Sequence, residues 1–134
     1  MGYLLDTDTC VYAIKGRETL IANLQRHHPD QLGVSTVTLG EIWFGAKKSR
    51  HAARMKKLAA TFLEALKVLD FTRLAAEHYA DIRFHLERRG TPIGERDQMI
   101  AAVARSERRV LVTHNLAEFA RVPRLALEDW TVEP

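Results

Sequence analysis

Five side chains with oxygen ligands are spread along the chain, and each lies near the end of a predicted strand or the start of a predicted helix. They are Asp6, Glu41, Asp97, Asn115 and Glu118. Oxygen ligands select hard cations, so these side chains, if they converge, predict a Mg²⁺ or Mn²⁺ site. One or two such ions can deprotonate a water molecule and neutralise the attacking and leaving oxygens of a phosphodiester. The chemistry we expect is therefore metal-dependent hydrolysis of a nucleic-acid backbone.

Each of the five has an expected role in that reaction. Asp6 and Asp97 are the expected principal metal ligands, and Glu41 is expected to bind a second ion or to orient the attacking water. Asn115 and Glu118 would complete or position the ligand set. Without a cation among them these carboxylates repel one another, and one or more must then stay protonated.

Two hydroxyl groups are expected to support the acids. Those of Thr7 and Thr38 could donate hydrogen bonds to the metal ligands and hold them in place. A structural interpretation is also open, because Thr38 and Glu41 have the spacing of a helix-capping box. Asp97, in the first turn of a helix expected to begin near residue 95, could likewise serve only to stabilise that helix end.

A run of basic residues without a single acid lies between Glu41 and Glu64. It comprises Lys47, Lys48, Arg50, Arg54, Lys56 and Lys57. Such a surface favours polyanions, of which nucleic acid is the commonest, although a solvated helix face is an equally good explanation. We assign Lys47 and Lys48 as candidate substrate contacts, together with His114, which adjoins the proposed site.

The other histidines do not form a site of their own. Paired histidines can cleave RNA without a metal, but no pair in this chain has a recognisable ligand spacing. We therefore expect these side chains on the surface or in helix packing, namely His27, His28, His51, His78 and His85.

Length and composition restrict the remaining possibilities. With 134 residues, 46% apolar and 28% charged, the chain is expected to form one globular domain over residues 1–134. Cys10 is the only cysteine, which excludes an internal disulfide or a cysteine metal cluster, and we expect it in the core. No apolar run is long enough to span a membrane and no signal peptide is recognisable, so we expect a cytoplasmic protein without membrane contact.

Strands and helices alternate in the pattern that must position these side chains. Strands are expected at residues 3–5, 33–37, 66–71, 109–113 and 125–127. The alternation predicts an α/β fold, with a central, mostly parallel sheet of four to five strands flanked by helices. Ligands of such sheets bind in the crevice at the carboxyl ends of the strands. Asp6, Glu41 and Asn115 follow the first, second and fourth strands, and Asp97 could reach the same crevice from the start of its helix.

An ordered set of short segments, nearly end to end in the chain, resembles the PIN-domain ribonucleases, and specifically the VapC toxins of bacterial toxin–antitoxin pairs. The segments are residues 3–7, 35–41, 90–97, 111–119 and 127–130. Any one of them is a weak signal, but the five in this order are specific.

The resemblance implies a PIN fold and a Mg²⁺- or Mn²⁺-dependent endoribonuclease. It also implies a cognate VapB-type antitoxin that blocks the site and a homodimer within a larger toxin–antitoxin complex. The acidic quartet of the family falls on Asp6, Glu41 and Asp97, with Asn115 or Glu118 in the fourth place. Members most similar to this chain commonly attack structured RNA such as initiator tRNA, so tRNA is the expected substrate.

Two positions depart from the family pattern. Asp8 stands where Asn is usual, which adds a negative charge beside the predicted metal site. Glu95 and Arg96 stand where Pro and Asn are common, so a cation adjoins Asp97. We expect Arg96 to pair with Glu95 in the free protein.

Two other functions are compatible with parts of the sequence. Asp6 and Asp8 form the Asp-x-Asp pattern of haloacid-dehalogenase-type phosphatases, in which the first attacks phosphorus and the second is the general acid. That class also needs a lysine and a late acidic pair, whereas Thr113, His114 and Asn115 follow the fourth predicted strand. The other alternative is a catalytically inert partner-binding module whose acids only cap helices.

Overall fold

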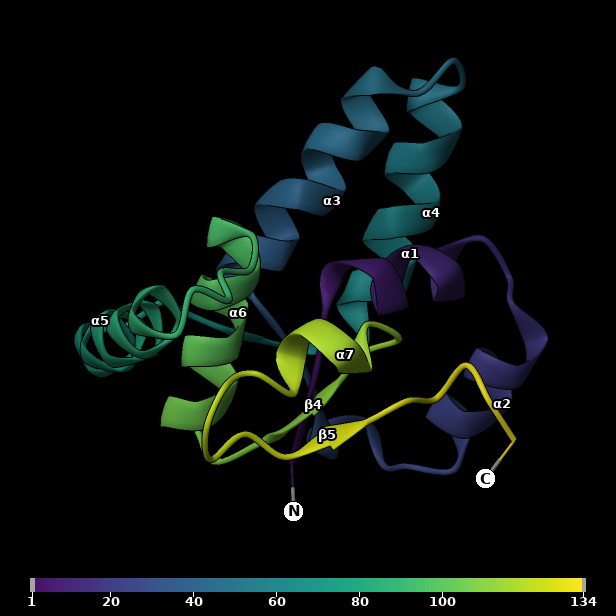
Figure 1. The fold of residues 1–134 in the computed structure, drawn as a ribbon. Helices are drawn as coiled ribbons and strands as arrows, with labels where there is room; N and C mark the ends of the chain where they lie inside the picture. The colour runs from purple at the N-terminus through teal and green to yellow at the C-terminus, as the bar shows by residue number, and fades with distance from the viewer. Residues whose placement is uncertain (1, 134) are drawn as a thin grey trace.

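A five-stranded parallel sheet forms the centre of the molecule (Figure 1), in a computed structural model that describes residues 2–133. The strands lie in the order β3-β2-β1-β4-β5, and every neighbouring pair is parallel. Their bounds are β1 (Tyr3–Leu5), β2 (Leu32–Ser35), β3 (Lys67–Leu69), β4 (Val110–Val112) and β5 (Leu127–Glu128). The predicted α/β class and parallel sheet are confirmed.

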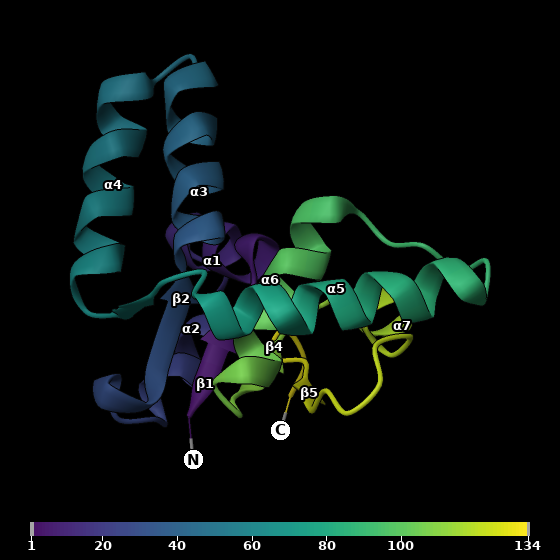
Figure 2. The same cartoon turned by 90° about the vertical axis from the view of Figure 1, so that its left-hand side faces the viewer.

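Helices cover both faces of this sheet (Figure 2). They are α1 (Thr7–Ile14), α2 (Glu18–Gln25), α3 (Thr36–Lys48), α4 (Ala52–Glu64), α5 (Arg73–Arg88), α6 (Glu95–Ser106) and α7 (Leu116–Phe119), with a 3₁₀-helix at Pro29–Gln31. Neighbouring strand residues point to opposite faces. Leu4 and Leu111 pack with α5 and α6, whereas Leu5 and Val112 pack with α1, α2 and α4, in the cluster that also buries Cys10.

Helices α3 and α4 form a hairpin that projects beyond the rest of the molecule (Figures 1 and 2). Lys47 and Lys48 lie in the last turn of α3, close to the far end of the hairpin. The rest of the basic run follows in the connecting loop and in α4. No helix among residues 2–133 is long and apolar enough to cross a membrane.

The start of α3 differs from the prediction. Ser35, the last residue of β2, is the N-cap of α3, and its Oγ accepts a hydrogen bond from the backbone N–H of Thr38 at 3.1 Å. The predicted capping box of Thr38 and Glu41 is therefore wrong, and the strand expected over residues 33–37 ends two residues earlier. The β-branched pair that follows Ser35 favours a strand locally, but the serine cap starts the helix there. Glu41 consequently lies in the second turn of α3, where no backbone group needs it as a cap.

The remaining strand boundaries differ by one or two residues. The strands expected over 66–71, 109–113 and 125–127 are observed as β3, β4 and β5, each shorter or displaced. Apolar runs indicate which residues are buried, whereas a strand is defined by ladder hydrogen bonds to its neighbour, so the ends are set by pairing.

Candidate active site

The predicted acids lie close enough to one another that the charges of Asp6, Glu41 and Glu118 all act on Asp97. Asp6 follows β1 directly, and Asp97 lies in the first turn of α6. Glu41 comes from α3, Glu118 from the short helix α7, and Asn115 is the N-cap residue of α7. Because β1 is the central strand and β4 its neighbour, residues that follow these two strands meet in the middle of the sheet edge where the strands end.

Asp6 is held rigidly at the centre of this edge. Its side chain is 4% exposed. Oδ1 accepts a hydrogen bond from the backbone N–H of Thr9 at 2.9 Å, as the N-cap of α1, and Oδ2 accepts one from the hydroxyl of Thr113 at 2.6 Å. Burial raises the pKa of Asp6, and the hydrogen bonds from Thr113 and Thr9 counteract that rise only in part. The Asp6 carboxylate is thus fixed in position and costly to ionise.

The negative charge of Asp97 is offset by fewer interactions than the charges of the other acids at this site. Burial first, and then the nearby charges of Asp6, Glu41, Glu118 and Asp8 in that order of strength, together raise the pKa of Asp97 to about 6. The helix dipole at the start of α6 favours a carboxylate, but burial and four neighbouring acids outweigh it. No hydrogen bond or ion pair of this carboxylate occurs within residues 2–133. A cation placed beside Asp97 would lower its pKa and remove this repulsion.

Glu41 is bound on both carboxylate oxygens. The hydroxyl of Thr7 donates to Oε1 at 2.6 Å, and Nε of Arg96 donates to Oε2 at 3.0 Å. The hydroxyls of Thr7 and Thr38 are 3.2 Å apart, so both threonines assigned from the sequence lie beside this acid. The expected pairing of Arg96 with Glu95 is wrong. Consecutive helical residues point in different directions, and Glu95 instead accepts a hydrogen bond from Tyr79 on α5 at 3.0 Å.

Asn115 and Glu118 form a pair of their own on α7. The side-chain amide of Asn115 donates to Oε2 of Glu118, and its backbone N–H donates to the hydroxyl of Thr113 at 3.0 Å. Glu118 also contributes to the raised pKa of Asp97, which places its charge in the same crevice. Thr113 therefore connects this pair to Asp6.

The side chains, as placed, do not form a complete ligand cluster. Within residues 2–133, no group of three or more Asp, Glu, His or Cys side chains could hold a metal ion. The donor chemistry nevertheless fits a hard divalent cation, because the donors are oxygens and Asp97 has no cationic partner. The donors to Asp6 are an uncharged amide and a hydroxyl, whereas Glu41 is bound by the positively charged Arg96 as well as by Thr7.

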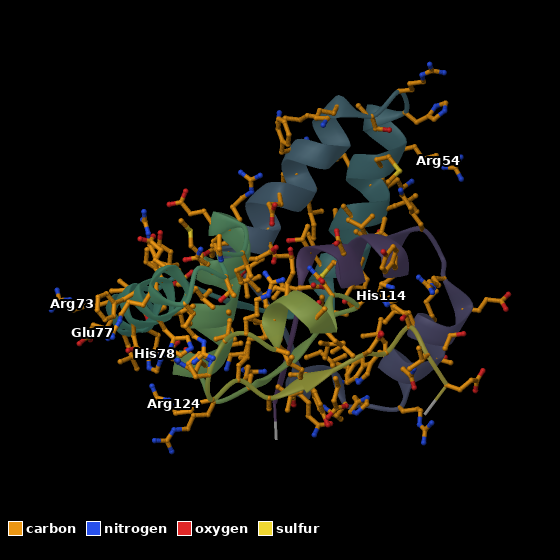
Figure 3. The ribbon with its side chains drawn as sticks, viewed as in Figure 1. Arg54, Arg73, Glu77, His78, His114 and Arg124 are labelled. Carbon is orange, nitrogen blue, oxygen red and sulfur yellow. The ribbon has the colours of Figure 1, made fainter. Side chains whose placement is uncertain are left out.

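The candidate substrate contacts lie outside the acidic group. His114 follows Thr113 and is exposed (Figure 3), with its Nδ1 3.1 Å from Oδ2 of Asp129 and 3.0 Å from the hydroxyl of Thr131. Lys47 and Lys48 lie on the same helix as Glu41 but toward its far end. The histidine is therefore placed beside the acids, and the lysines at a distance along the hairpin.

Three partners at this site were not identified from the sequence alone. Thr113 binds Asp6, Arg96 binds Glu41, and Asp129 orients His114. The one available signal was for Thr113, a hydroxyl residue directly after the fourth strand and thus at the same sheet edge as Asp6. Arg96 and Asp129 reach their partners across 55 and 15 residues of sequence, where no local pattern applies.

Comparison with known proteins agrees with this architecture. The family model described as the PIN domain matches residues 3–125. The chain belongs to the PIN-domain family. It is 41% identical to the tRNA(fMet)-specific endonuclease VapC of Salmonella typhimurium over 130 residues, which is 97% of this chain and 98% of that protein. It is 38% identical to the protein of the same name from Shigella flexneri, over 98% of this chain and 99% of that protein.

Solved structures give the same result for the PIN fold. The chain matches VapBC2 from Rickettsia felis, bound to a DNA fragment from their promoter, with a TM-score of 0.92 and 36% identity over 97% of this chain and 99% of that chain. It matches DNA-bound VapBC from Salmonella typhimurium with the same TM-score of 0.92 and 40% identity, over 97% of this chain and 98% of that chain. The PIN match includes every predicted acid and ends before Asp129.

Proposed function

We propose that this PIN-domain chain is the toxin of a type II toxin–antitoxin pair, a VapC-type endoribonuclease that hydrolyses RNA with Mg²⁺ or Mn²⁺ in the cytoplasm. The observation that carries the proposal is the uncompensated carboxylate of Asp97, whose pKa is raised to about 6 by burial and by four neighbouring acids. A divalent cation would relieve that repulsion. The 41% identity to a tRNA(fMet)-specific endonuclease supports RNA as the substrate.

We propose a separate role for each residue of the crevice. Asp6, held by Thr9 and Thr113, and Asp97 would hold the ion directly. The ion, when bound, supplies a water of lowered pKa and positive charge for the phosphodiester oxygens. Glu41 would orient the attacking water or bind a second ion. Asn115 and Glu118, which are hydrogen-bonded to each other, would complete the ligand set.

Substrate contacts are proposed on two sides of the crevice. His114, oriented by Asp129, lies beside the acids and offers a ring nitrogen to a phosphate or a base. Lys47 and Lys48 extend a positive surface along the projecting hairpin, which can contact phosphates away from the cleaved bond. Structured RNA such as initiator tRNA is long enough to contact both, in accord with the names of the two relatives.

The partner we propose is a VapB-type antitoxin, within a complex that contains a toxin homodimer. The matched structures from Rickettsia felis and Salmonella typhimurium are VapBC complexes. This chain has an apolar groove of about 290 Å³ between α1, α3 and α4, lined in part by Val11, Ile42 and Met55. Phe44, on the same hairpin, is 61% exposed. An apolar surface of this kind, next to Glu41, suits a partner that blocks the site.

The Asp-x-Asp phosphatase alternative is not supported. The PIN-domain family model matches residues 3–125, a span that includes both Asp6 and Asp8. Asp8, the required general acid, is exposed on the first turn of α1.

The proposal is tested with Asp97→Asn and the matched control Glu95→Gln, which removes an exposed carboxylate two residues away. Millimolar Mg²⁺ or Mn²⁺ is expected to raise the melting temperature of the wild type and of E95Q but not that of D97N. The wild type and E95Q should cleave initiator tRNA in preference to an elongator tRNA. D97N should be at least about a hundredfold slower, and EDTA should stop all three.

Absence of a melting shift together with absence of cleavage in the wild type would favour the inert partner-binding alternative. Equal cleavage by D97N and the wild type would remove Asp97 from the mechanism.

A further inference from the structure

The ion pair between Arg96 and Glu41 joins two helices at the mouth of the crevice. Nε of Arg96, the second residue of α6, lies 3.0 Å from Oε2 of Glu41 in the second turn of α3. Both residues line a cavity of about 410 Å³, together with Gly94, Glu95, Asp97 and Met99. Among the described residues that line this cavity, Arg96 is the cationic one, and it is bound to one of the proposed metal ligands.

Among residues 2–133, Glu41 is the acid that forms an ion pair with Arg96. Glu95, its neighbour in sequence, faces α5, where it accepts from Tyr79 at 3.0 Å and lies 4.0 Å from Arg83. Asp97 is also adjacent in sequence, and side chains of consecutive helical residues diverge. Glu41 is consequently the acid that Arg96 reaches, although the two are 55 residues apart.

The pair is easily broken. The side chain of Arg96 is 72% exposed and that of Glu41 is 26% exposed, so water and salt screen their attraction. The hydroxyl of Thr7 donates to the other oxygen of Glu41. A cation that binds Oε2 of Glu41 has to displace the guanidinium of Arg96, because two positive charges this close repel each other.

We propose that Arg96 is a positioning residue for Glu41 that competes with the divalent cation for this carboxylate and so weakens metal binding. The inference rests on the proposed function. It explains why the acids come together without forming a complete ligand cluster in residues 2–133. Metal loading requires exchange of a guanidinium for an ion on Oε2, and the affinity for the ion is reduced by the free energy of the ion pair.

The test is Mn²⁺ affinity, measured by isothermal titration calorimetry on the RNA-free protein. Arg96→Gln is expected to bind Mn²⁺ about two- to fivefold more tightly than the wild type, the range that an exposed ion pair supports. Arg83→Gln is the matched control, because it removes an exposed arginine of the same end of the molecule that contacts Glu95 and not Glu41. Its Mn²⁺ affinity should equal that of the wild type.

Two further measurements separate competition from a merely structural tether. In the Glu41→Gln background, Arg96→Gln should no longer change the Mn²⁺ affinity, since the competition acts through Glu41. Arg96→Lys, which keeps the charge, should restore most of the weaker, wild-type affinity.

The outcomes distinguish this inference from the proposed function. If the wild type binds Mn²⁺ and R96Q binds it equally or more weakly, the competition is refuted while the metal-dependent function stands. The same gain in affinity for R83Q as for R96Q would also refute it, as a general effect of net charge. If neither the wild type nor R96Q binds Mn²⁺, the proposed function and the inference fail together.

Discussion

At its amino end, helix α6 carries Asp97, whose carboxylate has no hydrogen-bond partner among residues 2–133, whereas at its carboxyl end Arg105 donates to three different residues. The Arg105 side chain is only 5% exposed. Nε donates to Nδ1 of His78 at 2.8 Å, and the two terminal nitrogens donate to the carbonyl of Pro123 at 3.0 Å and to Oδ2 of Asp81 at 2.7 Å. Figure 3 shows His78 and Arg124 on this side of the molecule, where Arg124 also approaches Asp81.

The charged side chain at the carboxyl end of α6 stabilises the fold, whereas the one at the amino end belongs to the proposed active site. A buried charge whose three nitrogens all donate hydrogen bonds holds α5, α6 and the segment after α7 together. A partly buried charge without a partner lowers the free energy of unfolding. That loss is recovered only when a ligand supplies the opposite charge. The comparison predicts that substitutions at the two ends change stability in opposite directions.

The largest expected effect on stability is at the carboxyl end of α6, where Arg105 is paired. Arg105→Ala should lower the free energy of unfolding by about 2–4 kcal/mol, because it removes a buried network and the packing of the arginine stem. The matched control is Arg124→Gln, which removes an exposed arginine near the same Asp81 and should cost less than about 0.5 kcal/mol. Urea denaturation measures both, and equal losses would show that the buried network does not stabilise the fold.

A smaller effect on stability, of opposite sign, is expected at the amino end of α6, where Asp97 lies. At pH 7.5 and without divalent cation, Asp97→Asn should raise the free energy of unfolding by about 1–2 kcal/mol, a value discounted for the partial exposure of the side chain. The gain should disappear in saturating Mg²⁺, because the cation stabilises only the wild type. A D97N protein that is less stable than the wild type without metal would contradict the assignment of Asp97 as an uncompensated charge.

The smallest effects are those of pH, and they also differ in sign between the two ends. The pKa of Asp97 rises from 3.8 to about 6 on folding, so its contribution to stability falls as the pH increases from about 4 to 6. Burial, and next the charge of Arg105, lower the pKa of His78 below 6.5, so its contribution is present above pH 6.5 and is lost as the pH decreases.

Urea midpoints of the metal-free protein between pH 4 and pH 8 measure these two slopes. The stability difference between D97N and the wild type should grow from pH 4 to about 6 and then level off. His78→Gln should differ most from the wild type above pH 6.5, where Nδ1 of the neutral ring accepts from Arg105. A constant difference for D97N over the whole range would show that Asp97 titrates normally.

Much of the fold and of the acidic set followed from local patterns. Apolar runs and helical spacing indicated five strands and the main helices, because the spacing of apolar residues within a short segment shows which face of that segment is buried. The carboxyl ends of parallel strands share one sheet edge, which was sufficient to expect Asp6, Asn115 and Glu118 near one another. Asp97 was expected in the first turn of its helix because Gly90 and Gly94 precede it.

Local patterns failed where two signals competed or where the partner was distant. Thr38 and Glu41 match a capping box, but Ser35 caps the same helix three residues earlier. Glu95 and Asp97 both adjoin Arg96 in sequence, yet the guanidinium binds Glu41 on another helix. His78 was expected in helix packing, and the sequence held no sign that Arg105 would be its partner.

The sequence by itself determined which residues are buried, where strands and helices alternate, and that several acids follow the strands, because these properties depend on neighbours within a few positions. Only the tertiary structure decided which charges are paired. The packing of α3 against α6 joins Arg96 to Glu41, the packing of α5 against α6 encloses Arg105, and Asp97 is left among acids alone. Electrostatic free energies depend on distance and burial, and neither quantity is defined until the helices are packed on the sheet.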